Sequence, residues 1–522
     1  MHWADFTAQR FKESGLDNLV SCSGITPSGE FHIGHLREIL TAEMIHRSCI
    51  RLGLNSKYIF IVDSMDPLRR VYDFLSPKYE EYIGMPIAYI PAPDEQGEPG
   101  NGDISYAKYF LEPFLRALSS IGVLPEVIMN HETYESGKFA DEIDLVIKNK
   151  EGIKKIIEEI SGRRLSNDWF PFNPLGSDGS MDGVIVTGYE YPRVSWIDRF
   201  GVEGFADIRK GEGKLPWRID WAARWKIHGI TCEPAGKDHG AAGGSYDTGI
   251  PICELLGGKP PEKMVYEWIQ MKGKGPMSSS SGLTIGPIEA LEIIPPEIMR
   301  YTIARSKINR HIDFDTGETL IKIVDEYERI RDSISFEGVS NRMKKNKDTS
   351  EGALRLSQIV PEIMPDSSKI PFSHLSLLAQ IKSDNQDIWL SLKNSGHLIG
   401  EPSEWLVDRL WRMKNWINGP HFPEKFKISV NEVVSREILE HINEKQKVFL
   451  VILSEKLKKC EWENMAIVDS IKDAIRESGI NGGEGFTSIY LVILGKKSGP
   501  RAASLILEIG RDQVCNLLST MS

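Results

Sequence analysis

The first residues that could do chemistry are two histidines separated by a glycine: His32, Gly34 and His35. They end a loop at residues 24–35 that follows an apolar stretch and precedes a helical pattern at 36–52. A strand, a glycine-containing turn and a helix in this order provide backbone N–H groups and a helix N-terminus that bind phosphate. The two imidazoles add hydrogen-bond donors, and Gly34 lets a nucleotide lie against the backbone. The loop therefore predicts a nucleotide site.

A second loop, at residues 271–282, contains Lys272, Lys274 and four consecutive serines after Met277. It follows a predicted strand at 264–269. Ammonium and hydroxyl groups in a loop can stabilise the charge that develops on phosphate groups during a reaction. The two loops together predict an ATP site that activates a carboxylate by adenylation. A plain serine-rich linker is the simpler alternative for the second loop.

The composition is that of a large globular protein. The chain has 522 residues, of which 41% are hydrophobic and 26% are charged, so two or three domains are expected. No apolar run reaches about 18 residues and the N-terminus has no signal pattern, so we expect no membrane span and a cytoplasmic protein. The six cysteines form no CxxC pair, which argues against a disulfide framework or a zinc site. The net charge of −11 neither indicates nor excludes a nucleic-acid partner.

The elements that must position the two loops alternate between strand and helix patterns. The predicted strands are 19–23, 57–63 and 126–129. The predicted helices are 36–52 and 104–118. This alternation favours a parallel sheet with helices on both faces. Asp63 and Asp66 follow the second strand, at the edge where open sheets bind ligands, although capping of the next turn is the alternative.

The pattern changes in two places further along the chain. From about residue 163 to 213, short strand-like pieces rich in Gly, Pro and Asp predict an insertion, and because it contains no cysteine we expect no zinc there. After about Pro287 helical periods dominate, so the second half is predicted to be mostly α-helical. A polar stretch at 342–348 is predicted to be a linker or an exposed basic loop.

The two loops also resemble known motifs. The first resembles the HIGH motif of class I aminoacyl-tRNA synthetases, and the second resembles their KMSKS loop. Three further segments, at 215–225, 233–239 and 242–249, resemble the class I lysyl-tRNA synthetases, as does 495–501, and the resemblance covers nearly the whole chain. It implies an α/β fold with a Rossmann-like catalytic domain, an insertion and a mostly α-helical C-terminal tRNA- and anticodon-binding half. The expected boundaries are 1–290 for the catalytic domain, 291–335 for a helical stem-contact region and 336–522 for the anticodon-binding domain.

The resemblance implies ATP-dependent ligation of L-lysine to tRNA(Lys) through a lysyl-adenylate, with transfer to the 3′-terminal adenosine and Mg²⁺ on the phosphate oxygens. The implied catalytic residues are His32, His35, Ser278 and Ser279. Lys274, two residues before Pro276, is expected to supply the cation of the second loop. Those implied for ATP are Thr26, Pro27, Gly34, Gly236, Asp238, Met277 and Ser280. Those implied for lysine are Gly24, Thr26, Trp217, His239 and Tyr266. Those for tRNA are Lys496, Lys497 and Arg501, and no residue is expected to ligate a metal.

Three tryptophans, Trp217, Trp221 and Trp225, recur at intervals of four residues, which is typical of a core-facing helix stripe. Most of the stripe is therefore expected to lie in the core. Trp217 is the member expected to contact a ligand.

One position departs from the family pattern. Pro276 stands where the KMSKS loop usually begins with Lys, and Ser279 stands where some relatives have a second Lys. This leaves open a tRNA-binding paralogue that has lost catalysis, although such a protein would not need His32 and His35. A glutamyl- or glutaminyl-tRNA synthetase is the alternative within the class. A small-molecule adenylyltransferase is disfavoured because the helical half would have no role.

Overall fold

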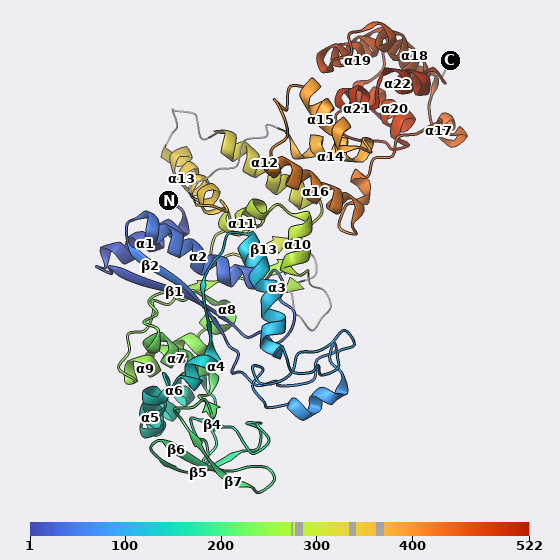
Figure 1. Cartoon of the computed structure of the whole chain (residues 1–522). Coiled ribbons are helices and arrows are strands. Elements are labelled where there is room, and N and C mark those ends of the chain that lie inside the picture. The colour runs from blue at the N-terminus through green and yellow to red at the C-terminus, as the bar shows by residue number, and fades with distance from the viewer. Residues whose placement is uncertain (273–274, 277–284, 334–340, 362–369, 521–522) are drawn as a thin grey trace. The chain divides into compact units, whose positions relative to one another are not determined.

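Figure 1 shows the computed structural model of the chain, which describes residues 1–272, 275–276, 285–333, 341–361 and 370–520. The chain divides into two compact units. The first comprises Met1–Leu291, Pro296–Asp315 and Ser333–Met364, and the second comprises Glu292–Pro295, Thr316–Asp332 and Pro365–Ser522. Within the described ranges, no helix is both long and apolar enough to cross a membrane.

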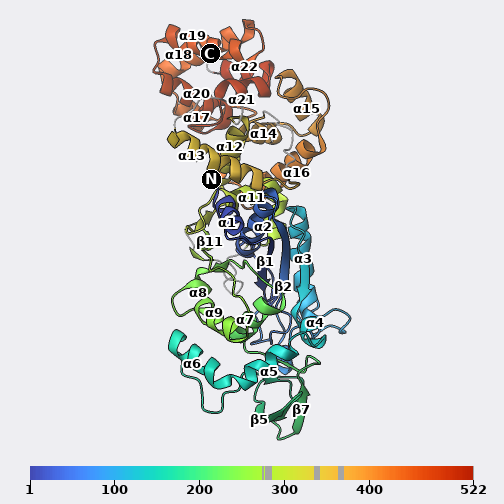
Figure 2. The ribbon, with the colours of Figure 1, turned by 90° about the vertical axis from the view of Figure 1, so that its left-hand side faces the viewer.

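A parallel sheet lies at the centre of the first unit (Figure 2). Its hydrogen-bonded strands, in order, are β1 (Asn18–Ile25), β2 (Asn55–Val62) and β3 (Glu126–Met129). Gly24 lies opposite Ile61 and Val62 lies opposite Met129, so the carboxyl ends of the three strands are aligned. Each predicted strand is confirmed to within two residues at either end. Residues 58–62 are all buried, which explains the continuous apolar run of β2.

The strand order continues on the other side of β1. The backbone N–H of Cys22 donates to the carbonyl of Cys232 at 2.8 Å, and the segment that follows leads into β9 (Ala235–Gly236), which pairs in parallel with β10 (Val265–Tyr266). The spatial order is therefore β3–β2–β1–β9–β10, with a reversal between β1 and β9. Open α/β sheets bind ligands outside the carboxyl ends of the strands at such a reversal.

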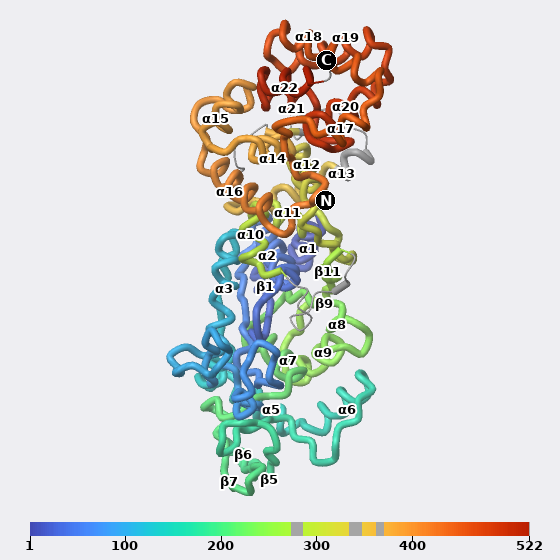
Figure 3. The backbone as a smooth tube through the Cα atoms, turned by 90° about the vertical axis from the view of Figure 1, so that its right-hand side faces the viewer, coloured from blue at the N-terminus to red at the C-terminus, as the bar shows by residue number. Residues whose placement is uncertain are grey.

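Helices cover this sheet. α2 (His35–Arg51) contacts β1, β2 and α1 (Trp3–Glu13), as Figure 3 shows for β1. α7 (Trp217–Ile227) contacts α9 (Ser245–Leu255), which contacts α6 (Lys150–Ser161). Further helices between residues 77 and 356 are η1 (Pro77–Tyr82), α3 (Tyr106–Ser120), α4 (Asn130–Glu135), α5 (Ala140–Lys148), α8 (Lys237–Gly240), α10 (Pro287–Ile293), α11 (Pro296–Ala304) and α13 (Asn341–Leu356).

Small antiparallel sheets occupy the segment between α6 and α7, where the sequence predicts short strands. β5 (Ile185–Glu190), β6 (Arg193–Ile197) and β7 (Glu203–Asp207) pair in this order. β4 (Asn173–Pro174) pairs with β8 (Gly213–Lys214), which ends just before α7. The insertion therefore ends in a short strand two residues before α7.

The prediction of one continuous strand at 264–269 is wrong in detail. The structure has two short strands there, β10 and β11 (Ile269–Met271), because the chain changes partners between them. The N–H of Glu267 donates to the carbonyl of Ile308 at 2.9 Å. β11 then pairs in parallel with β13 (Ile312–Phe314), which the sequence did not indicate, and in antiparallel with β12 (Gly275–Pro276).

The prediction of a linker or loop at 342–348 is also wrong. Helix α13 begins at Asn341 and ends at Leu356. Lys, Arg and Met favour helices, so a polar stretch can be helical when one end is held in place. The buried Arg300 holds that end, because its Nε and Nη2 donate to the carbonyl of Leu356 at 3.0 and 2.8 Å.

The second unit is helical, as predicted (Figure 1). Its core includes Phe449, Leu450, Leu453 and Leu457 of α18 (Glu444–Lys459), which contacts α19 (Asn464–Ser478), α20 (Gly482–Leu494) and α22 (Arg511–Ser519). The helices that lie mainly or wholly in this unit are α12 (Glu318–Ser333), α14 (Phe372–Ile381), α15 (Asn385–Asn394), α16 (Glu404–Asn418), η2 (Glu424–Phe426), α17 (Arg436–Glu440), α18 (Glu444–Lys459), α19 (Asn464–Ser478), α20 (Gly482–Leu494), α21 (Ala502–Ile509) and α22 (Arg511–Ser519).

Candidate active site

The loop that joins β1 to α2 brings the two predicted catalytic histidines together. The ring centroids of His32 and His35 are 4.0 Å apart, and Nδ1 of His32 accepts from the N–H of Gly34 at 3.1 Å. A Cβ at Gly34 would lie 2.6 Å from that nitrogen, so only glycine fits there. Phe31 holds the loop in place by stacking on Phe114 of α3, with ring centroids 4.1 Å apart.

Both imidazoles are neutral at neutral pH. Burial lowers the pKa of His32 to about 4, and burial together with the neighbouring ring lowers the pKa of His35 to about 3. A neutral imidazole carries one N–H donor and one acceptor. The pair can therefore donate hydrogen bonds to phosphate oxygens without a proton being taken up first.

The chain returns to this first loop directly after the second one. The N–H of Ile33 donates to the carbonyl of Ile285 at 3.1 Å. At the start of the second loop, Nζ of Lys272 lies 3.2 Å from a carboxylate oxygen of Asp315. The predicted residues of the second loop lie outside the residues that the structure describes; they are Lys274, Met277, Ser278, Ser279 and Ser280.

Two residues predicted for lysine binding meet at a carboxylate that the sequence analysis missed. Glu38, in the first turn of α2, accepts from the N–H of Gly24 at 2.9 Å and from the hydroxyl of Tyr266 at 3.1 Å. Its signal in the sequence is an acidic residue four positions after Gly34, within an otherwise apolar helix face. Glu38 connects α2 with the ends of β1 and β10.

The other aromatic residues predicted for lysine binding also lie together. Trp217 and His239 stack, with ring centroids 5.1 Å apart and an angle of 24° between the rings. Trp217 is half-buried, whereas Trp221 and Trp225 are buried in the core. The tryptophan stripe is thus a core stripe that ends in one accessible ring, beside His239.

The residues predicted for the nucleotide lie in two segments. A Cβ at Gly236 would lie 2.5 Å from Oδ1 of the exposed Asp238 and 3.3 Å from Nε1 of Trp268, so glycine lets these side chains approach the backbone. Pro27 is buried in the loop after β1. Thr26, in the same loop, donates its hydroxyl hydrogen to Asp66 at 2.9 Å.

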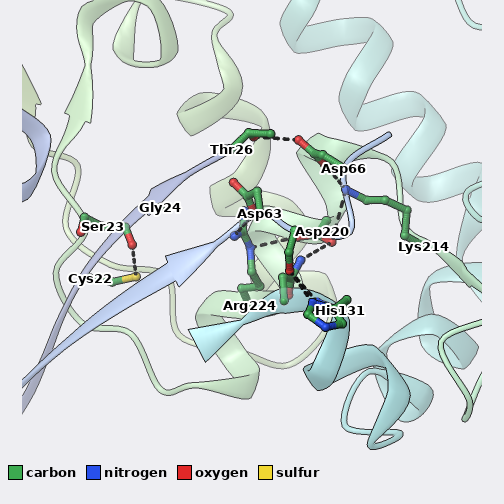
Figure 4. Close-up of polar contacts among 12 residues, drawn as sticks. Cys22, Ser23, Gly24, Thr26, Asp63, Asp66, His131, Lys214, Asp220 and Arg224 are labelled. Carbon is green, nitrogen blue, oxygen red and sulfur yellow. Dashed lines mark hydrogen bonds and ion pairs between the residues drawn. The ribbon is translucent and has the colours of Figure 1, made fainter. Parts of the chain in front are cut away.

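Asp66 belongs to a buried ionic network at the carboxyl edge of the sheet (Figure 4). Lys214 of β8 pairs with Asp66, and Arg224 of α7 pairs with Asp63. Nε of Arg224 also lies 2.9 Å from Asp220, a residue whose carboxylate lies 3.9 Å from Lys214. Burial raises the pKa of Asp63 to about 7, against the opposing effect of Arg224. The insertion and α7 therefore supply cations to carboxylates that follow β2.

Lys214, Asp220 and Arg224 were also missed from the sequence. The signal for Asp220 and Arg224 is a pair of opposite charges four residues apart within the Trp- and Ala-rich helix α7, whereas Lys214 has no local signal. His131 is a further missed residue. Its Nδ1 lies 2.7 Å from the hydroxyl of Ser64, directly after β2 (Figure 4).

The residues predicted for tRNA lie in the second unit, in and beside the loop between α20 and α21. Lys497 and Arg501 are exposed, whereas Nζ of Lys496 donates to the carbonyls of Glu424 and Lys427 at 3.2 and 2.7 Å. Arg501 lines a groove of about 1390 Å³. Its lining includes the aromatic side chains of Trp462, Phe486 and Tyr490.

Comparison with known proteins agrees with this arrangement. Residues 1–359 match the family described as tRNA synthetases class I (K), and residues 421–520 match the anticodon binding domain family. The curated lysine–tRNA ligase of Picrophilus torridus is 35% identical over 100% of this chain and 99% of its own length. That of Thermoplasma acidophilum is 38% identical over 94% of each protein. A glutamate tRNA ligase from Elizabethkingia meningosepticum, solved in complex with its amino acid, is 15% identical with a TM-score of 0.44, covering 96% of this chain and 99% of that one.

A parallel sheet with a histidine pair at the β1–α2 loop, followed along the chain by a helical unit, is the organisation predicted from the sequence. The chain belongs to the class I tRNA synthetases of the lysine group, tRNA synthetases class I (K).

Proposed function

We propose that the chain ligates L-lysine to tRNA(Lys) at the expense of ATP. The observation that carries the proposal is similarity over the whole length to proteins named lysine–tRNA ligase. In the first step the lysine carboxylate attacks the α-phosphate of ATP and expels pyrophosphate. In the second step a hydroxyl of the 3′-terminal adenosine of the tRNA attacks the adenylate, and AMP leaves. The substrates imply an enzyme of the cytoplasm.

The histidine pair supports the first step. Neutral His32 and His35 can donate to phosphate oxygens as negative charge moves toward the leaving group. At Gly34 and Gly236 a Cβ would meet the side chains of His32 and Asp238, so glycine lets these two side chains lie close to the backbone of the proposed nucleotide site. Stabilisation by preorganised donors and positioning are the main contributions expected in such a reaction.

Mg²⁺ is part of the proposal only as a companion of ATP. Among the described residues, no group of three or more His, Cys, Asp or Glu side chains could hold a metal ion. Phosphate oxygens are the hard ligands that Mg²⁺ prefers, and the ion would reduce their charge repulsion. The chain's own residues therefore need only accept a nucleotide that already carries the ion.

For the second loop we propose that Lys274 supplies the cation that Pro276 cannot. Loss of a donor that acts only in the transition state costs roughly 10²–10³ in kcat. Lys274→Ala should therefore lower kcat with little change in the KM for ATP, and Lys272→Ala is its matched control. A normal kcat for Lys274→Ala would assign the role to Lys272 or to the serines.

For tRNA we propose that the groove beside Arg501 binds unpaired anticodon bases. Aromatic side chains such as Trp462 and Phe486 can stack with bases, and exposed cations contact phosphates.

The test of the whole proposal is aminoacylation of total tRNA with each of the twenty amino acids, using His35→Asn as the inactive control. We expect lysine alone to be attached. Attachment of glutamate or glutamine would show the alternative within the class. Binding of tRNA without attachment of any amino acid would show a non-catalytic paralogue.

A further inference from the structure

Arg37 comes two residues after the histidine pair and is buried in the first unit. It lies in the first turn of α2 with 1% of its surface exposed. Burial lowers its pKa to about 10, so the guanidinium is still charged at neutral pH. Among the described residues, no carboxylate forms an ion pair with it, and its partners are backbone carbonyls.

Four carbonyls accept hydrogen bonds from this one side chain. Nε donates to Glu267 at 3.2 Å, and Nη1 donates to Ile303 at 3.3 Å. Nη2 donates to both Lys307 and Ile308, at 3.0 and 3.3 Å. A guanidinium can do this because its N–H groups point outward in one plane, whereas the donors of a lysine all lie on one nitrogen. Arg37 thus joins segments that are far apart in the sequence.

These carbonyls lie where the second loop is anchored. Glu267 lies two residues before β11, which leads into the second loop, and Ile308 lies four residues before β13, the parallel partner of β11. The N–H of Glu267 also donates to the carbonyl of Ile308 at 2.9 Å, so Arg37 holds the point at which the two segments meet. Ile303 lies in the last turn of α11, where carbonyls need outside donors and a positive charge is favourable.

The chain on the far side of the second loop is attached to the same segment. The N–H of Ile33 donates to the carbonyl of Ile285 at 3.1 Å. Residues 33–37 therefore hold the chain on both sides of the second loop, through a backbone hydrogen bond on one side and through the Arg37 side chain on the other. Of these two attachments, only that of Arg37 is removed by changing a side chain.

We propose that Arg37 is a positioning residue that sets the second loop against the histidine pair. Its donors are engaged by the protein's own carbonyls, so it acts through the starts of β11 and β13 rather than by contact with a substrate. The proposal rests on the proposed function and extends it. A misplacement of about 1 Å can cost about 10²-fold in rate, so a reaction that needs two loops in register depends on what holds them there.

The first readout is kinetic. Arg37→Met should lower kcat for the attachment of lysine about 10- to 100-fold per folded enzyme, because the donors of the second loop then meet the developing charge less well. The KM for ATP and the KM for lysine should each change less than about threefold, since ground-state binding is retained. Urea unfolding of the same preparation gives the folded fraction.

The second readout does not depend on activity. Lys272 directly follows β11 and its side chain is 58% exposed, so trypsin can cleave after it. If Arg37 fixes β11, Arg37→Met should speed this cleavage several-fold relative to cleavage after Lys497, an exposed residue of the second unit. Arg37→Lys keeps a charged donor and should lie between the wild type and Arg37→Met in both readouts.

The matched control is Arg300→Met. Arg300 is also fully buried in the first unit, where it pairs with Glu43 and donates to the carbonyls of Leu356 and Ile121, neither of which borders the second loop. This variant should lose stability, as Arg37→Met does. It should keep the wild-type kcat per folded enzyme and the wild-type rate of cleavage after Lys272.

Three results would overturn the proposal. They are an unchanged kcat in Arg37→Met, a lowered kcat without faster cleavage after Lys272, and the same two effects in Arg300→Met. If Arg37→Met does not fold, Arg37→Lys takes its place in both comparisons. Failure of the wild type to attach lysine would overturn the proposed function, and the cleavage rates would still show whether Arg37 holds β11.

Discussion

Asp66 is a buried carboxyl and Glu38 is a partly buried one in the same unit, and they differ in their partners. Asp66 pairs with Lys214 and accepts from Thr26. Burial alone would raise its pKa, yet the Lys214 ammonium lowers it below the ordinary value. Among the residues that the structure describes, Glu38 accepts hydrogen bonds only from the N–H of Gly24 and the hydroxyl of Tyr266, and burial raises its pKa to about 8.

The difference shows how one fold can use buried charge in two ways. A carboxylate whose counter-ion comes from the same fold fixes the geometry of its neighbours, here Thr26 in the first loop. A carboxylate without a counter-ion lowers the stability of the free protein but is ready to accept a cation. We therefore expect substitutions at the two places to have opposite effects on stability.

The largest expected effect is that of Lys214→Met. Asp66 would be left buried without a cation, which costs about 3–5 kcal/mol of the free energy of unfolding. Urea unfolding of the full chain measures the loss. The double variant Lys214→Met with Asp66→Asn should recover part of it, because the unpaired charge is then gone. A loss below about 1 kcal/mol would mean that the pair does not stabilise the unit.

Glu38→Gln should stabilise the chain instead. The pKa of Glu38 is raised in the folded state to about 8, so the unfolded chain loses its proton first as pH rises from about 4. Stability from this group is thus lost as pH rises toward 8. The variant should be more stable than the wild type by roughly 1–3 kcal/mol at pH 8.5, and by less at pH 5.5. If the difference in the free energy of unfolding between Glu38→Gln and the wild type is the same at pH 8.5 and pH 5.5, the pKa of Glu38 is not raised.

Trp217→Ala tests an aromatic face as a partner for the lysine cation. A cation over a tryptophan ring gains about 0.5–2 kcal/mol, so the KM for lysine should rise roughly 2- to 30-fold. The KM for ATP should be nearly unchanged. Trp221→Phe, in the buried part of the stripe, is the control. Equal increases in the KM for lysine and the KM for ATP would indicate that Trp217 has a packing role.

The sequence predicted the parts of the fold that depend on local pattern. The strand β3 was predicted with its exact ends, and α2 to within one residue, because both have clear periods and boundaries. It failed where a distant partner decides the structure. β10 and β11 separate because Glu267 bonds to Ile308, and α13 ends where Arg300 holds Leu356.

The same limit applies to the site. His32, Gly34 and His35 form a local motif and could be found in the sequence. Glu38 could not be distinguished from an ordinary helix carboxylate, since its meaning depends on Tyr266, which is far away in the chain. Likewise, nothing local links Lys214 with Asp66.

The comparison of charges with and without partners extends to the second unit. Nζ of Lys496 already donates to the carbonyls of Glu424 and Lys427, whereas Arg501 is exposed at the start of α21. Arg501→Ala should therefore raise the KM for tRNA several-fold and leave the KM for lysine nearly unchanged. If Arg501 contacts a phosphate, the slope of log affinity against log salt concentration should fall by about 1.

Lys496→Ala is the matched control, because it removes one positive charge from the same loop. Its ammonium is engaged with backbone carbonyls, so its loss should affect the stability of the loop more than tRNA affinity. Filter binding of tRNA at several salt concentrations separates the two cases. If Arg501→Ala keeps the tRNA affinity and its salt dependence, while Lys496→Ala lowers both, the side chain that contacts RNA is Lys496, although its ammonium is bonded to carbonyls. The presence of an internal partner would then fail to distinguish structural charges from binding charges in this unit.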